Sequence, residues 1–192
     1  MALNAVPWRV HAVLPRSLAN GPGTRFTIWS QGCVLACPGC FNPETHPGGA
    51  GQMRLTGELV DEVLAELPHL DGVTLTGGEP LEQPRAIQEF CAEVRKTGLG
   101  IVVLTGFTVA EIEADQEKAA AVAAADMVVA GRYNARRHLG TGLRGSANKT
   151  YWPLTNRYSA GDFATVPEVE VFIAADATVT VTGMEPLERG IA

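Results

Sequence analysis

The stretch Cys33-Val-Leu-Ala-Cys37-Pro-Gly-Cys40 places three cysteines within eight residues, in the spacing C-x3-C-x2-C. Three thiolates held this close together can bind three corners of a cubane iron–sulfur cluster. No further cysteine follows nearby, so one iron of such a cluster would lack a protein ligand and could bind another molecule. An incompletely ligated cluster indicates chemistry at that iron, whereas a fully ligated cluster more often only carries electrons.

Zinc is the alternative metal for this loop, because thiolates bind both metals. Structural zinc sites usually close with four ligands, and the candidates for a fourth are Cys91 and His46. Cys91 falls on the apolar face of a predicted helix over residues 84–96, where a free cysteine behaves as a small apolar residue. His46 is more typical of a loop residue than of a ligand. The cysteines alone favour an iron–sulfur cluster and leave zinc open.

A second segment, Gly72-Val-Thr-Leu-Thr76-Gly77-Gly78-Glu79-Pro80, is a short β-rich run that ends in Gly-Gly-Glu-Pro. Paired glycines at the end of a strand let the backbone approach a ligand closely. A carboxylate beside them can accept hydrogen bonds from an ammonium group. By itself the segment could be a simple turn from a strand into a helix. One βα unit after the three-cysteine loop, it indicates an amino-acid-like group held near the open iron.

With these two segments, the sequence resembles the radical S-adenosylmethionine (SAM) family. Within that family it is similar to the small activating enzymes of glycyl radical enzymes, and most of all to the activating proteins of anaerobic ribonucleotide reductases. The likeness covers roughly residues 5 to 150, and the cysteine motif and Gly-Gly-Glu-Pro are specific as a pair. The supporting stretches are residues 20–25, 31–43, 105–108, 131–133 and 144–148.

The resemblance implies a radical SAM enzyme whose [4Fe–4S] cluster is held by Cys33, Cys37 and Cys40. SAM would bind the open iron through its amino and carboxylate groups, and its reductive cleavage would give methionine and a deoxyadenosyl radical. The favoured substrate is a backbone glycine of a partner glycyl radical enzyme, such as anaerobic ribonucleotide reductase. An electron donor such as flavodoxin or ferredoxin would supply the electron.

Two other functions stay open. In the first, the same radical acts on a peptide or small metabolite in a biosynthetic pathway, because such scaffolds change substrate readily. In the second, the chain is a noncatalytic zinc- or iron–sulfur-binding protein.

The resemblance also assigns the contacts to the methionine end of SAM. Gly77, Gly78 and Glu79 match the family segment that contacts the methionine amino group. Thr105 ends a predicted strand and is expected at the same rim.

Three further residues are candidates for SAM contacts. Gly39 stands where the backbone of the family contacts adenine, and where many members carry an aromatic residue; here Phe41 follows the last cysteine instead. Arg132 follows a predicted strand, within residues 127–161, which contain no Asp or Glu. Part of this basic segment would either line the SAM carboxylate or bind an acidic loop of a partner, or it is simply a solvated loop.

The alternation of strands and helices predicts an α/β fold with a parallel sheet. Strands are expected over residues 25–30, 73–76, 101–104 and 127–130, and helices over 58–67, 84–96 and 119–125, with a further helix starting at the capping box of Thr108 and Glu111. Ligands bind at the carboxyl ends of parallel strands, so the cysteine loop, Gly-Gly-Glu-Pro and Thr105 should share one edge. The chain is short for an eight-unit barrel, which predicts an open, partial parallel β/α barrel of the radical SAM type.

We expect a single domain, with the radical SAM core in residues 1–154 and a C-terminal extension in 155–192. Residues 168–173 and 178–182 alternate as strands of a β-hairpin packed on the core. The hairpin could cover the open edge of the barrel, dock a partner or extend the sheet, and extension is the favoured interpretation because exposed edges usually need cover.

Composition sets the remaining limits. The 192 residues are 46% hydrophobic, which is enough for one domain with a real core. The net charge of −6 gives no support to nonspecific nucleic-acid binding. No apolar run reaches membrane-spanning length, and the first residues lack the basic start and apolar core of a signal peptide. We therefore expect a cytoplasmic protein that binds neither nucleic acid nor membrane.

Overall fold

A computed structural model describes residues 6–173 and 175–184 of the chain. The strands are β1 (Pro7–Ser17), β2 (Arg25–Ser30), β3 (Gln52–Leu55), β4 (Gly72–Gly77), β5 (Gly100–Leu104), β6 (Met127–Ala130), β7 (His138–Leu139), β8 (Gly145–Ser146), β9 (Thr150–Pro153), β10 (Val169–Ile173) and β11 (Val179–Gly183). The α-helices are α1 (Thr56–Glu66), α2 (Pro84–Arg95), α3 (Val109–Glu113), α4 (Gln116–Val122) and α5 (Ala160–Phe163). None of the helices in the described part of the chain has the length and apolar character needed to cross a bilayer.

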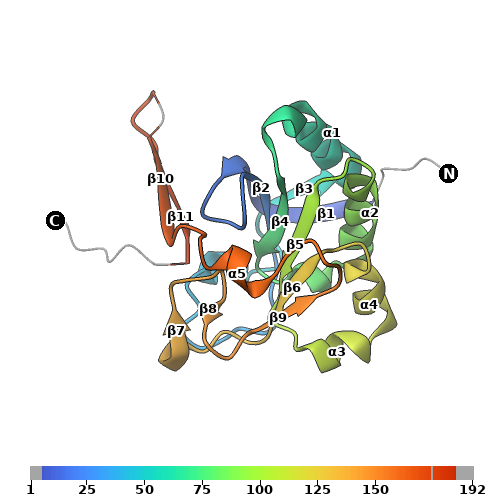
Figure 1. The fold of residues 1–192 in the computed structure, drawn as a ribbon, viewed down its shortest axis with the longest axis vertical. Coiled ribbons are helices and arrows are strands. Elements are labelled where there is room, and N and C mark those ends of the chain that lie inside the picture. Colours follow the sequence, from blue (N-terminus) through green and yellow to red (C-terminus); the bar gives the residue numbers. More distant parts are fainter. Residues whose placement is uncertain (1–5, 174, 185–192) are drawn as a thin grey trace.

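The centre of the fold is a seven-stranded sheet with the order β3-β1-β2-β4-β5-β6-β9 (Figure 1). Strands β2, β4, β5 and β6 run parallel to one another, with pairs such as Val73 beside Ile101. Helices lie in the crossovers between these parallel strands, as expected for βαβ units. The predicted α/β fold and its open parallel core are therefore confirmed. The structure adds antiparallel strands at both edges, β1 and β3 on one side and β9 on the other.

Apolar packing on both faces fixes the central strands. In β5, Ile101 and Val103 face the helices, where they join Phe90 of α2 in the main core. Their neighbours Val102 and Leu104 face the other side and join a second apolar cluster. All of these side chains are at most 6% exposed, and burying each contributes roughly 1.5–3 kcal/mol. A strand buried on both faces needs an unbroken apolar run, which is why β5 was visible in the sequence.

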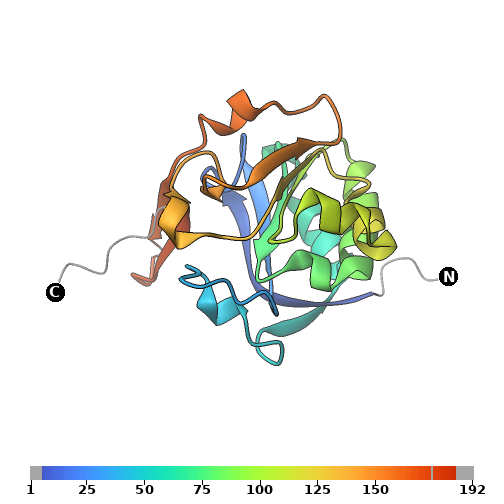
Figure 2. The ribbon, with the colours of Figure 1, turned by 90° about the horizontal axis from the view of Figure 1, so that it is seen from below.

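The helices α1, α2 and α4 cover one face of the sheet (Figure 2). In α1, which overlaps the helix predicted over residues 58–67, Leu59 and Val63 are buried against the sheet, whereas Leu64 is 45% exposed. The capping box predicted at Thr108 and Glu111 does begin α3.

The predicted C-terminal hairpin is present as β10 and β11, but it forms a two-stranded sheet of its own (Figure 1). Extension of the main sheet, the favoured interpretation of this segment, is therefore wrong. The Glu170 carboxylate attaches the hairpin by accepting hydrogen bonds from Ser17 Oγ at 2.7 Å and from the Leu18 backbone N–H at 2.8 Å. Asn20 Nδ2 donates to Thr182 Oγ1 at 2.8 Å. Residues 185–192 of the predicted extension lie outside the described residues.

The amino ends of the parallel strands are joined by a buried cation, Arg25. Its guanidinium is fully buried and donates five hydrogen bonds, so that every side-chain nitrogen has a partner. The acceptors are Thr74 Oγ1, Tyr158 Oη and the carbonyl oxygens of Pro22, Val73 and Gly100. Burial is the main cause that lowers the pKa of Arg25. These bonds hold β2, β4 and β5 together at one edge.

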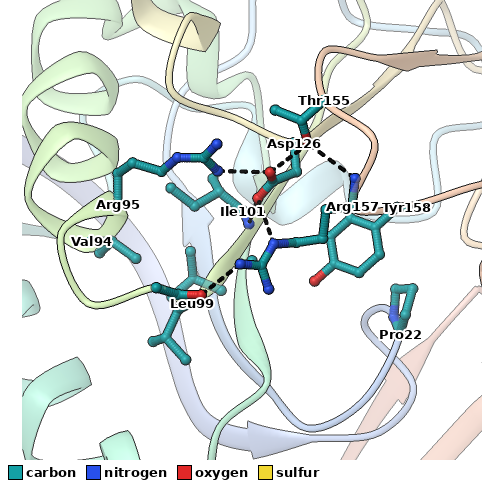
Figure 3. Close-up of polar contacts among 12 residues, drawn as sticks. Pro22, Val94, Arg95, Leu99, Ile101, Asp126, Thr155, Arg157 and Tyr158 are labelled. Atoms are coloured by element: carbon teal, nitrogen blue, oxygen red, sulfur yellow. Dashed lines mark hydrogen bonds and ion pairs between the residues drawn. The ribbon is translucent and has the colours of Figure 1, made fainter.

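Asp126, a buried anion, joins β5, β6 and the segment after β9 by hydrogen bonds (Figure 3). Its side chain is 1% exposed and accepts hydrogen bonds from Arg95 at 2.7 Å, Thr155 Oγ1 at 2.7 Å and the Ile101 backbone N–H at 2.9 Å. Arg157 adds an ion pair at 3.6 Å. The carboxylate is thus compensated on both oxygens, as a buried charge requires.

Candidate active site

The predicted site residues meet at the carboxyl edge of the parallel strands. The cysteine loop follows β2, Gly77 to Glu79 end β4, and Thr105 follows β5. All open onto one cavity that encloses about 640 Å³ of space continuous with solvent. The lining includes Cys33, Cys37, Cys40, Phe41, His46, Gly77, Gly78, Glu79, Thr105, Tyr133, Arg144, Lys149 and Met184. This convergence is what parallel topology predicts for a ligand site.

The cysteine loop turns back on itself so that its thiols face this cavity. The Cys40 backbone N–H donates to the Cys37 carbonyl at 3.0 Å, and Gly39 between them has φ +73°. The Cys33 backbone N–H donates to the His46 carbonyl at 3.1 Å, which closes the base of the loop. The turn at Gly39 therefore needs a residue that tolerates a left-handed backbone.

The three thiols are free and partly buried. Burial raises the pKa of Cys33, and backbone hydrogen bonds from Leu35 and Ala36 oppose that shift by stabilising the thiolate. Burial likewise raises the pKa of Cys40. The fourth cysteine, Cys91, is fully buried in the main core, where its pKa is raised to about 12, so it is not available to this loop.

The chemistry of the three side chains fits an iron–sulfur cluster. Cys33, Cys37 and Cys40 line one cavity, and a [4Fe–4S] cluster takes one thiolate per iron, so three thiolates leave the fourth iron open. Among residues 6–173 and 175–184, no group of three His, Cys, Asp or Glu side chains is already arranged to hold a metal ion.

The paired glycines join the Gly-Gly-Glu-Pro segment to the cysteine loop. The Gly78 backbone N–H donates to the Ser30 carbonyl, and the Glu79 N–H donates to the Gly32 carbonyl, both at 2.8 Å. A Cβ atom on Gly78 would lie 2.3 Å from the Gly32 carbonyl oxygen, so no larger residue fits there. Gly77 has φ +102°, which side chains rarely adopt. The sequence predicted that the paired glycines let the backbone approach a ligand closely. At Gly78, the group approached is the backbone of Gly32, at the start of the cysteine loop.

Glu79 is fully buried, and its carboxylate organises the rim of the cavity. One oxygen accepts from the Leu81 N–H at 2.9 Å and from Thr105 Oγ1 at 2.7 Å, and the other accepts from the Gly106 N–H at 2.7 Å. Burial raises the pKa of Glu79, and these hydrogen bonds oppose the shift. Glu79 and Thr105 therefore bind β4 to β5 where both strands reach the cavity.

The remaining predicted contacts are distributed differently. Phe41 lines the cavity and packs edge-on against Tyr133, with ring centroids 5.2 Å apart. Gly39 lies on the outer side of the loop, beside Arg132 and not in the cavity lining. Arg132 forms a two-fold ion pair with Glu111, at 2.9 Å for each nitrogen, and also donates to the Gly106 carbonyl. The Arg132 guanidinium therefore binds α3 through Glu111 and does not line the cavity.

The sequence did not predict several of the residues that line the cavity. Among them is Lys149, a basic side chain close to the cysteines and Glu79. Burial lowers the pKa of Lys149, while the charges of Glu79, Cys37 and Cys40 oppose that shift. The Lys149 side chain reaches the cavity because β9 runs antiparallel beside β6, and nothing in the sequence predicted β9. The available signal was its place directly after residues 144–148, one of the stretches that carry the resemblance.

The C-terminal extension also reaches the site. Met184, directly after β11, is 7% exposed, lines the cavity and belongs to the second apolar cluster. A neighbouring groove is lined by β1, β11, Phe41 and Met184, and so connects the hairpin with the cavity.

Comparison with known proteins agrees with this geometry. The family model described as "4Fe-4S single cluster domain" matches residues 19–152, which include the cysteine loop, Glu79, Thr105 and Lys149. The match ends before the hairpin.

Three relatives illustrate the likeness. The anaerobic ribonucleoside-triphosphate reductase-activating protein of Salmonella typhi is 38% identical over 117 residues, 56% of this chain and 75% of the relative. The protein of the same description from Vibrio cholerae is 32% identical over 148 residues, 72% of this chain and 94% of the relative. A pyruvate formate-lyase-activating enzyme of Listeria monocytogenes is 38% identical over 95 residues, 47% of this chain and 38% of that enzyme.

Proposed function

The chain belongs to the 4Fe-4S single cluster domain family, among the radical SAM activating enzymes of glycyl radical enzymes, and from this membership we propose that it installs a glycyl radical on a partner enzyme. An anaerobic ribonucleoside-triphosphate reductase is the proposed partner, because the relatives from Salmonella typhi and Vibrio cholerae are described as activators of that enzyme.

The residues of the chain hold and shield the cofactors. Cys33, Cys37 and Cys40 would hold the [4Fe–4S] cluster, and the backbone at Gly77 and Gly78 would lie beside the amino-acid end of SAM. Glu79 and Thr105 fix the shape of that rim through their hydrogen bond. When bound, the cluster and SAM supply the reductive carbon–sulfur cleavage that yields methionine and a deoxyadenosyl radical.

In the proposed reaction, one hydrogen atom would pass from the partner to the deoxyadenosyl group. A glycine Cα–H bond of the partner would break, a C–H bond would form on the deoxyadenosyl carbon, and the unpaired electron would remain on the glycine. This step requires no acid–base pair, because the proton and the electron move together as a hydrogen atom. A low-potential donor protein such as flavodoxin or ferredoxin would supply the electron for the cleavage of SAM.

The observation that carries the proposal is the single cavity shared by two distant motifs. Three thiols from the loop after β2 and the Gly-Gly-Glu segment at the end of β4 line the same space. Their backbones are joined by the hydrogen bond from Glu79 to Gly32. The thiols would hold a cluster with one open iron, and the Gly-Gly-Glu segment would hold an amino-acid group that binds this iron. The two features therefore need to lie side by side.

The test uses the anaerobically reconstituted, reduced protein with SAM and a purified anaerobic ribonucleoside-triphosphate reductase. We expect deoxyadenosine to form, and a glycyl radical doublet to appear in electron paramagnetic resonance of the reductase. Pyruvate formate-lyase serves as the second partner, since one relative is described as its activator. Deoxyadenosine formation that is stimulated only by a short peptide or a small metabolite, with neither partner carrying the signal, would refute the activating role and favour the biosynthetic alternative.

A further inference from the structure

The outer face of the cysteine loop borders a groove that is separate from the cavity. Cys37 and Cys40 line the cavity, whereas Pro38 and Gly39, the two residues between them, are exposed and line this groove. Ala135 lies directly opposite, because a Cβ atom on Gly39 would be only 3.0 Å from the Ala135 Cβ. A protein that binds in the groove therefore touches the cysteine loop from outside, next to two of its three thiols.

A basic turn forms the other border of the groove. The short 3-10 helix Ala135–Arg137 places Arg136 in the groove lining and Arg137 directly after it, and both side chains are exposed. In the part of the chain that the structure describes, neither guanidinium pairs with a carboxylate. Arg132 also lines the groove, but Glu111 already neutralises its charge. Arg136 and Arg137 are therefore the two cations of the groove that remain for a partner.

Hydrogen bonds hold this basic turn in position. Asn134 Oδ1 accepts from the Arg136 backbone N–H at 3.0 Å and caps the turn. The Arg137 carbonyl accepts from the Ala147 N–H at 2.8 Å, which ties the turn to the segment after β8. The two arginine side chains thus extend from an anchored backbone beside the cysteine loop.

The charge of this region is opposite to that of the rest of the chain. Residues 127–161 hold six of the 15 lysines and arginines and no Asp or Glu, although the chain as a whole has a net charge of −6. The rest of the chain is therefore strongly acidic and repels an acidic protein, whereas the basic turn attracts one. Complementary charge of this kind accelerates encounter and fixes the orientation of the partner.

The position of the groove decides which acidic partner fits. In the proposed substrate step a hydrogen atom moves between atoms in contact, so the glycine of a substrate protein has to enter the cavity itself. An electron needs no such contact and can pass through the residues of a loop. A protein on the outer face of Pro38 and Gly39 is close to the cluster ligands but outside the cavity, which suits an electron donor and not a substrate. Electron-transfer complexes are also small and transient, as a single groove with one basic turn requires.

We propose that this groove, from Pro38 and Gly39 to the basic turn Ala135–Arg137, is the docking surface for an acidic one-electron donor protein. One electron leaves the reduced cofactor of the donor and enters the cluster, so that the donor is oxidised, the cluster is reduced and no atoms are exchanged. This inference rests on the proposed function, since it assumes a [4Fe–4S] cluster on the three cysteines.

The test compares a protein reductant with a small one. Reconstituted holoprotein and its double variant Arg136→Glu, Arg137→Glu are supplied with limiting reduced flavodoxin, or with photoreduced deazariboflavin, which is uncharged and needs no docking surface. At about 50 mM salt, we expect flavodoxin-supported cleavage of SAM to be at least about ten-fold slower in the double variant, because attraction becomes repulsion. Cleavage supported by deazariboflavin should change less than about two-fold.

Two further measurements report docking directly. Calorimetry with oxidised flavodoxin should give a dissociation constant about ten-fold weaker for the double variant. Raising the salt to about 300 mM should slow the flavodoxin-supported rate of the wild type and leave that of the double variant almost unchanged, because salt screens the attraction.

Lys96→Glu is the matched control. It makes the same change of charge at an exposed side chain that follows α2 and pairs with Glu93, and its flavodoxin-supported rate should stay within about two-fold of the wild type. The neutral double variant Arg136→Gln, Arg137→Gln should fall between the wild type and the charge-reversed variant. Iron content and the thermal unfolding midpoint show that each variant is folded and loaded; if the charge-reversed variant fails this check, the neutral one replaces it.

The outcomes separate the two proposals. Equal flavodoxin-supported rates in the wild type and the double variant, including no cleavage by either, would overturn the docking surface, and so would equal slowing with both reductants. Normal deoxyadenosine formation with deazariboflavin but loss of the glycyl radical on the reductase would show that the turn binds the reductase instead, which also overturns the inference. If the wild type forms no deoxyadenosine with either reductant, the proposed function itself fails.

Discussion

The two edges of the parallel sheet differ in how many protein partners their charged and titratable side chains have. At the amino edge, Arg25 donates five hydrogen bonds and Asp126 accepts three in addition to its ion pair with Arg157. At the carboxyl edge, three cysteine thiols are free and Lys149 donates one long hydrogen bond. At the amino edge, protein groups satisfy the buried charges, whereas at the carboxyl edge hydrogen-bond donors and thiols remain for ligands.

This difference separates structural from functional motifs. Residues 20–25, which supported the resemblance to the family, end in Arg25 and lie at the amino edge of the sheet, away from the cavity. Their match therefore reflects the joining of strands and not contact with a cofactor. In parallel α/β folds, conserved chemistry belongs to the carboxyl edge and stability to the amino edge.

The largest effect should come from breaking the carboxyl edge with Cys37→Ala. We expect loss of most bound iron and of all SAM cleavage, because a cluster ligand is removed. The measurement is iron and sulfide content after anaerobic reconstitution, together with deoxyadenosine formation. Cys91→Ala is the matched control and should retain its iron, since Cys91 is buried in the main core. Full iron content and cleavage in Cys37→Ala would contradict the ligand assignment.

Breaking the amino edge should cost stability and leave cofactor binding intact. Asp126→Ala removes the acceptor of the Ile101 N–H and the partner of two arginines, which we expect to lower the free energy of unfolding by about 3 kcal/mol. This is the low end for a broken buried pair, because Arg95 and Arg157 are 42% and 41% exposed and can turn to water. Urea unfolding measures the change. A loss below about 1 kcal/mol, or loss of SAM binding in the folded variant, would remove the distinction between the edges.

The same carboxylate predicts a pH dependence. Burial raises the pKa of Asp126, but hydrogen bonds from Arg95, Thr155 and Ile101 outweigh burial and hold the pKa below its ordinary value of 3.8. A lowered pKa stabilises the folded chain at pH values above 3.8, and this stabilisation is lost as the pH falls through the folded-state pKa. The stability advantage of the wild type over Asp126→Asn should therefore be full at pH 7 and shrink towards pH 3. Urea unfolding of the cluster-free chains at both pH values measures it; an advantage that grows at low pH would reverse the sign.

The smallest effect is expected where a charge at the carboxyl edge is already paired. Hydrogen bonds from the Thr108 backbone and from Arg132 lower the pKa of Glu111 to about 2. Both partners of the Arg132–Glu111 pair are about 40% exposed, so Arg132→Gln should cost only about 0.2–1 kcal/mol. Its dissociation constant for SAM should change less than about two-fold, because Arg132 pairs with Glu111 and does not line the cavity. A ten-fold weaker constant for Arg132→Gln would show instead that Arg132 contacts SAM.

The sequence predicted what depends on local pattern. β2 was expected at its observed bounds and β5 to within one residue, because both are short runs rich in β-branched and aromatic residues and bounded by turn residues. The cysteine loop and Glu79 were placed on one edge by the general rule for parallel strands. β1 was not predicted, because its 11 residues include Arg9, Pro15 and Arg16 and do not alternate cleanly.

What the sequence could not show depends on contacts between distant segments. Glu111 was recognised as a helix cap, but its pairing with Arg132 requires α3 and the end of β6 to be neighbours. Lys149 was seen only as part of a basic segment, because its position depends on the chain returning beside β6 as β9. Tertiary structure therefore determines that Lys149, and not Arg132, lines the cavity.

The hairpin has a consequence for how the protein behaves at high concentration. It turns Glu170 and Thr182 towards the body and leaves Val171, Ile173, Val179 and Val181 between 42% and 75% exposed. Two short strands with an apolar outer face favour edge-to-edge association of chains, the common route to aggregation of β-proteins. Concentrated samples should scatter light more strongly than those of Val181→Lys, whose charge blocks that association while the cavity keeps all its lining side chains.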